Sequence, residues 1–223
     1  MGTSKGVTPG NGRPSRGGRH TLIHRLADWA ERKPNAGAIY ARAGGGGEEP
    51  MRWRGYTWRE YWQAVRETAK GLISLGLKPG ECVALVGVNS PEWVIAQMGI
   101  MAARGIPAPI YTTNTPEQVA YILGHSQAEI AICDGAEQLA KYQAARGNDD
   151  VRVNTTITFD AVDGANHTLE ALRALGSQQD DTELDARIDA IDPRETSLLI
   201  YTSGTTGVPK AVQLCHEGMI VTG

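Results

Sequence analysis

The sequence predicts a three-layer α/β fold built on a mostly parallel β-sheet. Short apolar runs alternate with longer stretches of helical periodicity along its 223 residues, an order that is typical of parallel strands joined by crossover helices. The run 82–88 is almost continuously apolar, as expected of a strand covered by helices on both faces. The sequence contains no internal repeat.

The first elements have recognisable ends. Pro34 closes an apolar helical stripe that starts at Leu22, because proline cannot continue a helix. Thr57 and Glu60 form a capping box that opens a second helix. The expected elements are, in order, a helix from Leu22 to before Pro34, a hairpin of residues 38–42 and 51–56 around the glycines at 44–47, a helix to about Leu75, and the strand 82–88.

The alternation continues through the rest of the chain. Asn89 or Ser90 caps a helix that has Pro91 at its first position and Gly105 just past its end. Thr115 and Gln118 form a second capping box. The expected elements are, in order, the helix from Pro91, a strand at 108–111, a helix to about His125, a strand at 129–133, a helix at 136–145, a strand at 151–159, and helices at 168–175 and 182–190.

Composition excludes several classes of protein. The 22 basic and 25 acidic residues leave a net charge of −3, so no nucleic-acid partner is expected. Residues 1–20 are rich in Gly, Ser, Pro and Arg and are expected to form a disordered basic tail. Polar residues interrupt the longest apolar stretch, 93–110, so no membrane helix is expected. The basic tail leaves peripheral membrane contact as an alternative to a freely solvated segment.

The three cysteines indicate the compartment. Cys82, Cys133 and Cys215 are far apart in sequence and form no Cys-x-x-Cys pair. This pattern favours a reducing, cytoplasmic location. The sequence carries no indication of the oligomeric state.

A loop near the C-terminal end combines small residues, hydroxyls and a lysine. It follows the apolar run 198–201, which predicts a buried strand. Glycines let backbone N–H groups approach an anion, hydroxyls donate to phosphate oxygens, and lysine supplies a mobile positive charge. The loop therefore predicts an ATP triphosphate site formed by Thr202, Ser203, Gly204, Thr205, Thr206, Gly207 and Lys210.

Two other interpretations of this loop fit its residues less well. Ser, Thr and Gly are common in ordinary solvent loops, but here they stand in one run with Pro209 and Lys210, directly after a strand. A Walker A loop has four residues between its glycines and ends in Gly-Lys-Ser/Thr. The spacing between Gly204 and Gly207 excludes that motif.

The sequence of the loop and of its flanking residues resembles the signature of a known family. Residues 201–216 resemble the AMP-binding signature of adenylate-forming enzymes, which include acyl-CoA synthetases, firefly luciferase and the adenylation domains of peptide synthetases. Residues 89–93 and 105–117 are similar to the long-chain fatty acid and bubblegum-type acyl-CoA synthetases. Two positions depart from the pattern: Ala211 stands where glycine is usual, and Cys215 where serine is common.

The resemblance implies a two-step reaction. A fatty acid attacks the α-phosphorus of ATP, and CoA then displaces AMP, so the implied substrates and cofactors are a fatty acid, ATP, Mg²⁺ and CoA. Family members carry further catalytic elements after this loop. Residues 21–223 are therefore expected to be the N-terminal portion of an AMP-binding domain, truncated after the phosphate loop, without a catalytic residue and inactive alone.

Alternatives to the acyl-CoA synthetase remain open. One is a catalytically inert nucleotide-binding or interaction module that keeps the fold. The others lie within the family, namely a fatty-acyl-AMP ligase or another adenylating enzyme.

A few His and Asp residues outside the phosphate-binding residues could bind a metal or act as a base, but a structural role is expected for them. His20 and His24 lie four apart but lack a third ligand nearby in sequence, so no metal site is expected. Asp180 and Asp181 are expected to place negative charge at a helix N-terminus. His216 is expected to orient the strand after the loop, with a role as general base as the alternative.

Overall fold

The computed structural model describes residues 21–43, 52–202 and 209–221. The helices are α1 (Leu22–Arg32), α2 (Trp58–Ser74), α3 (Pro91–Ala102), α4 (Pro116–Ser126), α5 (Ala136–Ala145), α6 (Leu169–Ser177), α7 (Thr182–Asp189) and α8 (His216–Val221). The strands are β1 (Gly37–Ala43), β2 (Arg52–Thr57), β3 (Cys82–Val86), β4 (Ile106–Ile110), β5 (Ile130–Cys133), β6 (Thr155–Thr158), β7 (His167–Thr168), β8 (Thr196–Thr202) and β9 (Lys210–Cys215).

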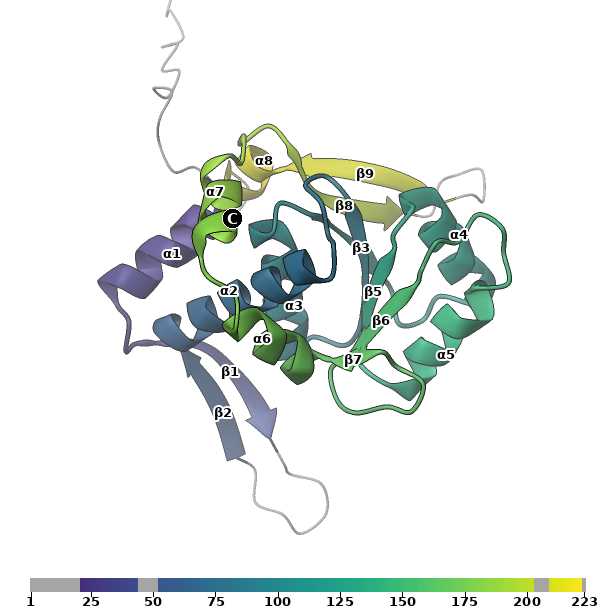
Figure 1. The fold of residues 1–223 in the computed structure, drawn as a ribbon, viewed down its shortest axis with the longest axis horizontal. Helices are drawn as coiled ribbons and strands as arrows, with labels where there is room; N and C mark the ends of the chain where they lie inside the picture. Colours follow the sequence, from purple (N-terminus) through teal and green to yellow (C-terminus); the bar gives the residue numbers. More distant parts are fainter. Residues whose placement is uncertain (1–20, 44–51, 203–208, 222–223) are drawn as a thin grey trace, which may run out of the picture.

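A five-stranded parallel sheet of order β4-β3-β5-β6-β7 forms the centre of the molecule. Helices α2, α3 and α6 cover one face, and α4 and α5 cover the other (Figure 1). Alternate strand residues enter the two cores, so that Val83 and Leu85 pack with the first group of helices, and Ala84 and Val86 with the second. The predicted three-layer α/β fold is confirmed.

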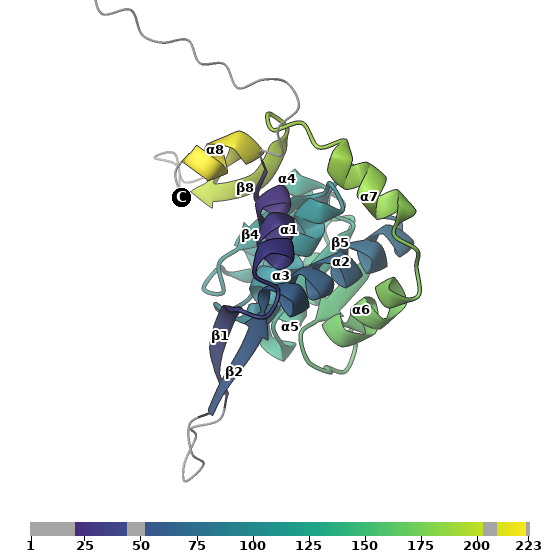
Figure 2. The ribbon, with the colours of Figure 1, turned by 90° about the vertical axis from the view of Figure 1, so that its left-hand side faces the viewer.

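Two antiparallel hairpins lie outside this sheet. The β1–β2 hairpin projects away from the three layers, whereas β8–β9 lies along another side of the molecule (Figures 1 and 2). The predicted first hairpin is confirmed, although its four glycines fall outside the described residues. The basic tail of residues 1–20 also lies outside them.

Strand β4 begins before its expected start. The strand was expected from Ala108, but it starts at Ile106 and includes Pro107 and Pro109. The Ile106 N–H donates to the carbonyl oxygen of Glu81, which precedes β3, so period-two alternation turns both proline nitrogens away from β3. An edge strand tolerates prolines there. Strand β8 packs beside β4 but pairs only with β9 within the described chain.

The remaining strand boundaries differ by small amounts. Strand β3 ends at Val86, β5 starts at Ile130, and β6 is limited to Thr155–Thr158. The two-residue strand β7 was not expected, because Thr168 was assigned to the following helix. In the structure Thr168 is the N-cap of α6, and its hydroxyl oxygen accepts the Ala171 N–H at 3.0 Å.

Helix ends follow the predicted chemistry closely. Both capping boxes are present, at Thr57 and at Thr115, and Ser90 rather than Asn89 caps α3. Gly105 lies just past α3, but Arg104 is the residue in the left-handed region, with φ of 62°. The Arg104 and Gly105 N–H groups donate to the Met101 and Ile100 carbonyls, as in a Schellman motif. Arg104 also forms an ion pair with Glu195.

Helices α2 and α6 approach so closely that glycine is required on both. A Cβ atom on Gly71 would lie 2.3 Å from the carbonyl oxygen of Leu172. A Cβ atom on Gly176 would lie 1.9 Å from the carbonyl oxygen of Glu67. Because both obstacles are backbone atoms, neither can be relieved by a side-chain rotation.

Helix α7 is tied to α2 by charge. Asp181 is the N-cap residue of α7, which confirms the expected negative charge at a helix N-terminus. Its carboxylate accepts a hydrogen bond from the Lys70 ammonium at 2.8 Å and pairs with Arg66 at 3.0 Å. Lys70 is only 8% exposed, and its contact lowers the pKa of Asp181 below the usual carboxyl range. The Asp181 carboxylate therefore has two roles: it places negative charge at the N-terminus of α7, and it neutralises the buried Lys70 ammonium.

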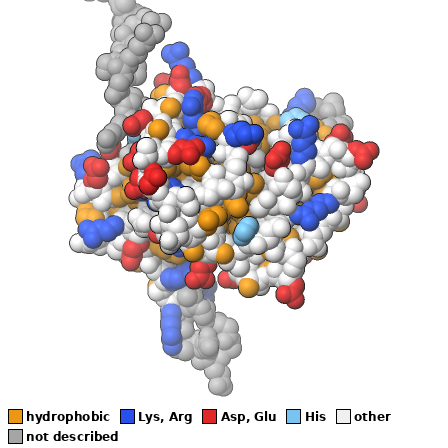
Figure 3. All heavy atoms as spheres, viewed as in Figure 1, with side chains coloured by type: hydrophobic (Ala, Val, Ile, Leu, Met, Phe, Trp, Pro, Cys, Tyr) orange, Lys and Arg blue, Asp and Glu red, His pale blue; other side chains and the backbone are white. Residues whose placement is uncertain are grey.

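The described surface carries both signs of charge. Basic and acidic side chains are interspersed on the face shown in Figure 3, in keeping with the net charge of −3. Among the described residues, no helix is both long and apolar enough to cross a lipid bilayer.

Candidate functional site

The β8–β9 hairpin brings the two described ends of the predicted phosphate loop together. Thr202 is the last residue of β8 and Lys210 the first residue of β9, and they are direct cross-strand partners. Both residues are exposed. Ser203, Gly204, Thr205, Thr206 and Gly207 lie outside the described residues.

The strands below this end are anchored by buried side chains. Leu198, Leu199 and Tyr201 of β8 are each at most 7% exposed, so β8 is fixed to the body of the molecule on both of its faces. Within the described chain, no carboxylate pairs with the Lys210 ammonium. A positive charge with no counter-ion among the described residues, at the end of a hairpin whose first strand is buried on both faces, is suited to a polyphosphate.

Two side chains of α4 contact the hairpin at the end that carries the loop. The Tyr121 hydroxyl donates to the Pro209 carbonyl oxygen at 3.0 Å, and His125 Nδ1 lies 3.0 Å from the Tyr201 hydroxyl. Neither residue was predicted from the sequence, because each lies more than 70 positions before its partner. Their spacing of four in a capped helix was the available signal, because it places them on one helix face.

His216 follows β9 directly and begins α8. It is 3% exposed, and Nδ1 has no hydrogen-bond partner among the described residues. Burial lowers the pKa of His216 to about 4. A buried neutral imidazole at the end of β9 supports the structural interpretation of His216 over the alternative of a general base.

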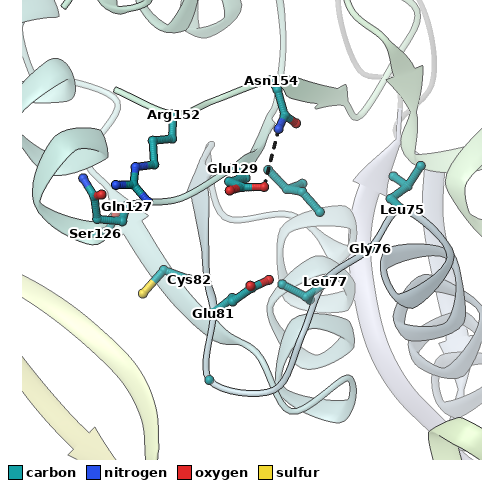
Figure 4. Close-up of a pocket in the computed structure, with 12 residues that line it drawn as sticks. Leu75, Gly76, Leu77, Glu81, Cys82, Ser126, Gln127, Glu129, Arg152 and Asn154 are labelled. Carbon is teal, nitrogen blue, oxygen red and sulfur yellow. Dashed lines mark hydrogen bonds between the residues drawn. The ribbon is translucent and has the colours of Figure 1, made fainter. Parts of the chain in front are cut away.

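A pocket of about 320 Å³ lies at the amino ends of the parallel strands (Figure 4). Glu81 and Glu129 approach it from the residues just before β3 and β5, Cys82 from the start of β3, and Arg152 and Asn154 from the segment before β6. Asn154 Nδ2 is 3.5 Å from Glu129 Oε2. Two carboxylates and one guanidinium make this pocket a poor site for a polyphosphate.

A second pocket, of about 640 Å³, lies at the carboxyl ends of β3, β4 and β5. Ligands of open α/β sheets commonly bind at this edge. Its lysine, Lys141, already donates to the Thr112 carbonyl at 2.7 Å and pairs with Glu137 at 3.3 Å. With Asp134 also lining the pocket, no unpaired cation remains there for phosphate.

The described residues contain no group of three His, Cys, Asp or Glu side chains that could hold a metal ion. Mg²⁺ is often bound through one or two protein groups together with substrate phosphates. At such a site the exposed Thr202 hydroxyl and Lys210 ammonium would donate to the phosphate oxygens, because an ammonium has no lone pair to offer the metal.

Comparison with known proteins identifies relatives of the sequence. The chain is 35% identical over 175 residues to the rat long-chain-fatty-acid–CoA ligase ACSBG1, covering 77% of this chain and 24% of that protein. It is 32% identical over 171 residues to human ACSBG2, covering 75% of this chain and 26% of that protein. The chain thus spans about a quarter of the length of these relatives.

Solved structures share the fold. A long-chain-fatty-acid–CoA ligase (FadD1) from Archaeoglobus fulgidus matches with a TM-score of 0.73 and 21% identity, over 92% of this chain and 38% of that one. The A-PCP didomain of a carboxylic acid reductase from Segniliparus rugosus, in complex with AMP, matches with a TM-score of 0.72 and 19% identity, over 88% and 32%. The family model described as AMP-binding enzyme matches residues 26–223, so the chain belongs to the AMP-binding enzyme family.

Proposed function

We propose that this chain supplies the ATP polyphosphate-binding part of a long-chain fatty acid–CoA ligase. The observation on which the proposal depends is that Thr202 and Lys210 are cross-strand partners. This pairing brings the two ends of the signature loop together and leaves the Lys210 ammonium exposed beside them. In this proposal the ligands of the β- and γ-phosphates are Thr202, Ser203, Gly204, Thr205, Thr206, Gly207 and Lys210.

The proposed role follows from where charge develops in the reaction. A fatty acid carboxylate oxygen attacks the α-phosphorus of ATP, the bond from that phosphorus to the bridging oxygen of pyrophosphate breaks, and acyl-AMP forms. The CoA thiolate then attacks the acyl carbonyl carbon, and AMP leaves. Donors aimed at the departing pyrophosphate stabilise the first transition state. Mg²⁺ bound to the phosphates would share that charge.

The substrate class rests on the relatives. The names of the mammalian proteins at 32–35% identity describe long-chain fatty acid–CoA ligases. In the protein that contains this sequence, exchange between ATP and pyrophosphate is therefore expected to depend on a long-chain acid such as palmitate. Equal exchange with acetate or an amino acid would contradict this substrate class.

Replacing Lys210 with alanine tests the phosphate site. Because a hydrogen bond to a charged group contributes about 1.5–3 kcal/mol, Lys210→Ala is expected to weaken Mg·ATP binding roughly 10- to 100-fold. Isothermal titration of the chain with Mg·ATP measures this loss. The matched control is Lys78→Ala, which removes an exposed lysine from a distant turn. Unchanged affinity in Lys210→Ala would contradict the proposed site.

A further inference from the structure

The two ends of the phosphate loop are each held by the same face of α4. On the β9 side, the Tyr121 hydroxyl donates to the carbonyl oxygen of Pro209, the residue before Lys210. On the β8 side, His125 Nδ1 lies 3.0 Å from the hydroxyl of Tyr201, the residue before Thr202. Figure 1 shows α4 beside this end of the β8–β9 hairpin.

The three rings form one continuous contact. The Tyr121 and His125 rings stack with their centroids 5.9 Å apart, and the His125 ring meets the Tyr201 ring edge-on at 5.6 Å. Tyr201 is 5% exposed, and burial raises its pKa well above the usual tyrosine range. Its phenol therefore keeps a proton that it can donate to His125 Nδ1.

Helix α4 is rigid enough to act as a support. Its N-terminus has the Thr115 capping box with Pro116 at the first helical position. Val119, Ile122 and Leu123 are at most 1% exposed and pack into the second core. Side chains at spacings of three and four fix one helix face to the sheet, so the neighbouring Tyr121 and His125 are presented at a defined place.

We propose that Tyr121 and His125 are positioning residues, which hold both ends of the phosphate loop at the separation that ATP polyphosphate binding requires. The proposal rests on the proposed function of that loop. It adds two residues that lie outside the signature and touch no phosphate themselves. Their effect passes through the backbone of Pro209 and the side chain of Tyr201.

Tyr121→Phe tests the β9 side, because it removes the hydroxyl and keeps the ring. Hydrogen exchange of the backbone amides at 201–202 and 210–212 in the full chain is expected to become about three- to tenfold faster, the effect of one lost hydrogen bond. His125→Phe is expected to act similarly through the β8 side. The control is Tyr40→Phe, which removes the hydroxyl of an exposed tyrosine on the β1–β2 hairpin.

Mg·ATP titration of the same variants gives the functional readout. Tyr121→Phe is expected to weaken binding about three- to tenfold, while Tyr40→Phe binds as the parent chain does. If the parent chain binds no Mg·ATP, the proposed function fails, and the exchange measurement then decides only whether Tyr121 and His125 support the two ends of the loop.

Two results would overturn the positioning role. One is exchange and affinity of both α4 variants within twofold of the parent chain. The other is exchange that rises equally at β3 and β5, which would show a general loss of stability instead of local support.

Discussion

Replacing Gly176 with alanine is expected to lower the free energy of unfolding by about 3 kcal/mol, the upper part of the range for overpacked cores. The added Cβ atom would lie 1.9 Å from the Glu67 carbonyl oxygen and 2.7 Å from the Gly71 nitrogen. Helix α6 must therefore move away from α2, which also loosens Leu172, a side chain that is 1% exposed. Urea unfolding measures the loss.

Helix propensity alone predicts that Gly176→Ala would stabilise the protein, so the sign of the measured change distinguishes the two effects. Alanine is better than glycine within a helix by about 1 kcal/mol, so Gly176→Ala would stabilise α6 if α2 were more distant. A control for the added Cβ atom alone is Gly147→Ala, in the turn after α5, where the nearest atom would be 4.0 Å away. A Gly176→Ala protein as stable as its parent would contradict the close crossing of α2 and α6.

Local signals in the sequence were sufficient for most elements of the fold. The capping boxes at Thr57 and Thr115 and the apolar run that became β3 depend on neighbouring residues only, and each is present. What the sequence could not show is how elements approach each other. The glycine pair at the α2–α6 crossing involves residues about 100 positions apart, and nothing local distinguishes Gly176 from a helix-ending glycine.

In the candidate site, too, one part could be predicted from local sequence and the other depends on how distant elements pack. Thr202 and Lys210 were predicted from the order of residues in one loop, and the structure pairs them across a hairpin. Their support by Tyr121 and His125 depends on where α4 packs. The separation of β8–β9 from the parallel sheet likewise depends on two neighbouring strands, since Pro107 and Pro109 remove donors from the outer edge of β4.

His216 is expected to make the protein less stable as the pH falls below about 6.5. Burial lowers its pKa from 6.5 to about 4; nearby Glu195 acts in the opposite direction, and His24 adds to the lowering. Between these two values the unfolded chain binds a proton that the folded chain does not, so stability declines as the pH falls. The full difference corresponds to about 3 kcal/mol, at about 1.4 kcal/mol per pKa unit.

Two paired carboxylates contribute to the pH dependence of stability at lower pH than His216 does. Lys70 lowers the pKa of Asp181 and Arg104 lowers that of Glu195, so their stabilising effects are lost only at still lower pH. Urea unfolding across this range should show a steep slope in the parent chain and a shallower one in His216→Asn. NMR titration of the imidazole provides a direct check. A measured pKa near 6.5 would show that burial does not disfavour the charged imidazole, which would return His216 to consideration as a base.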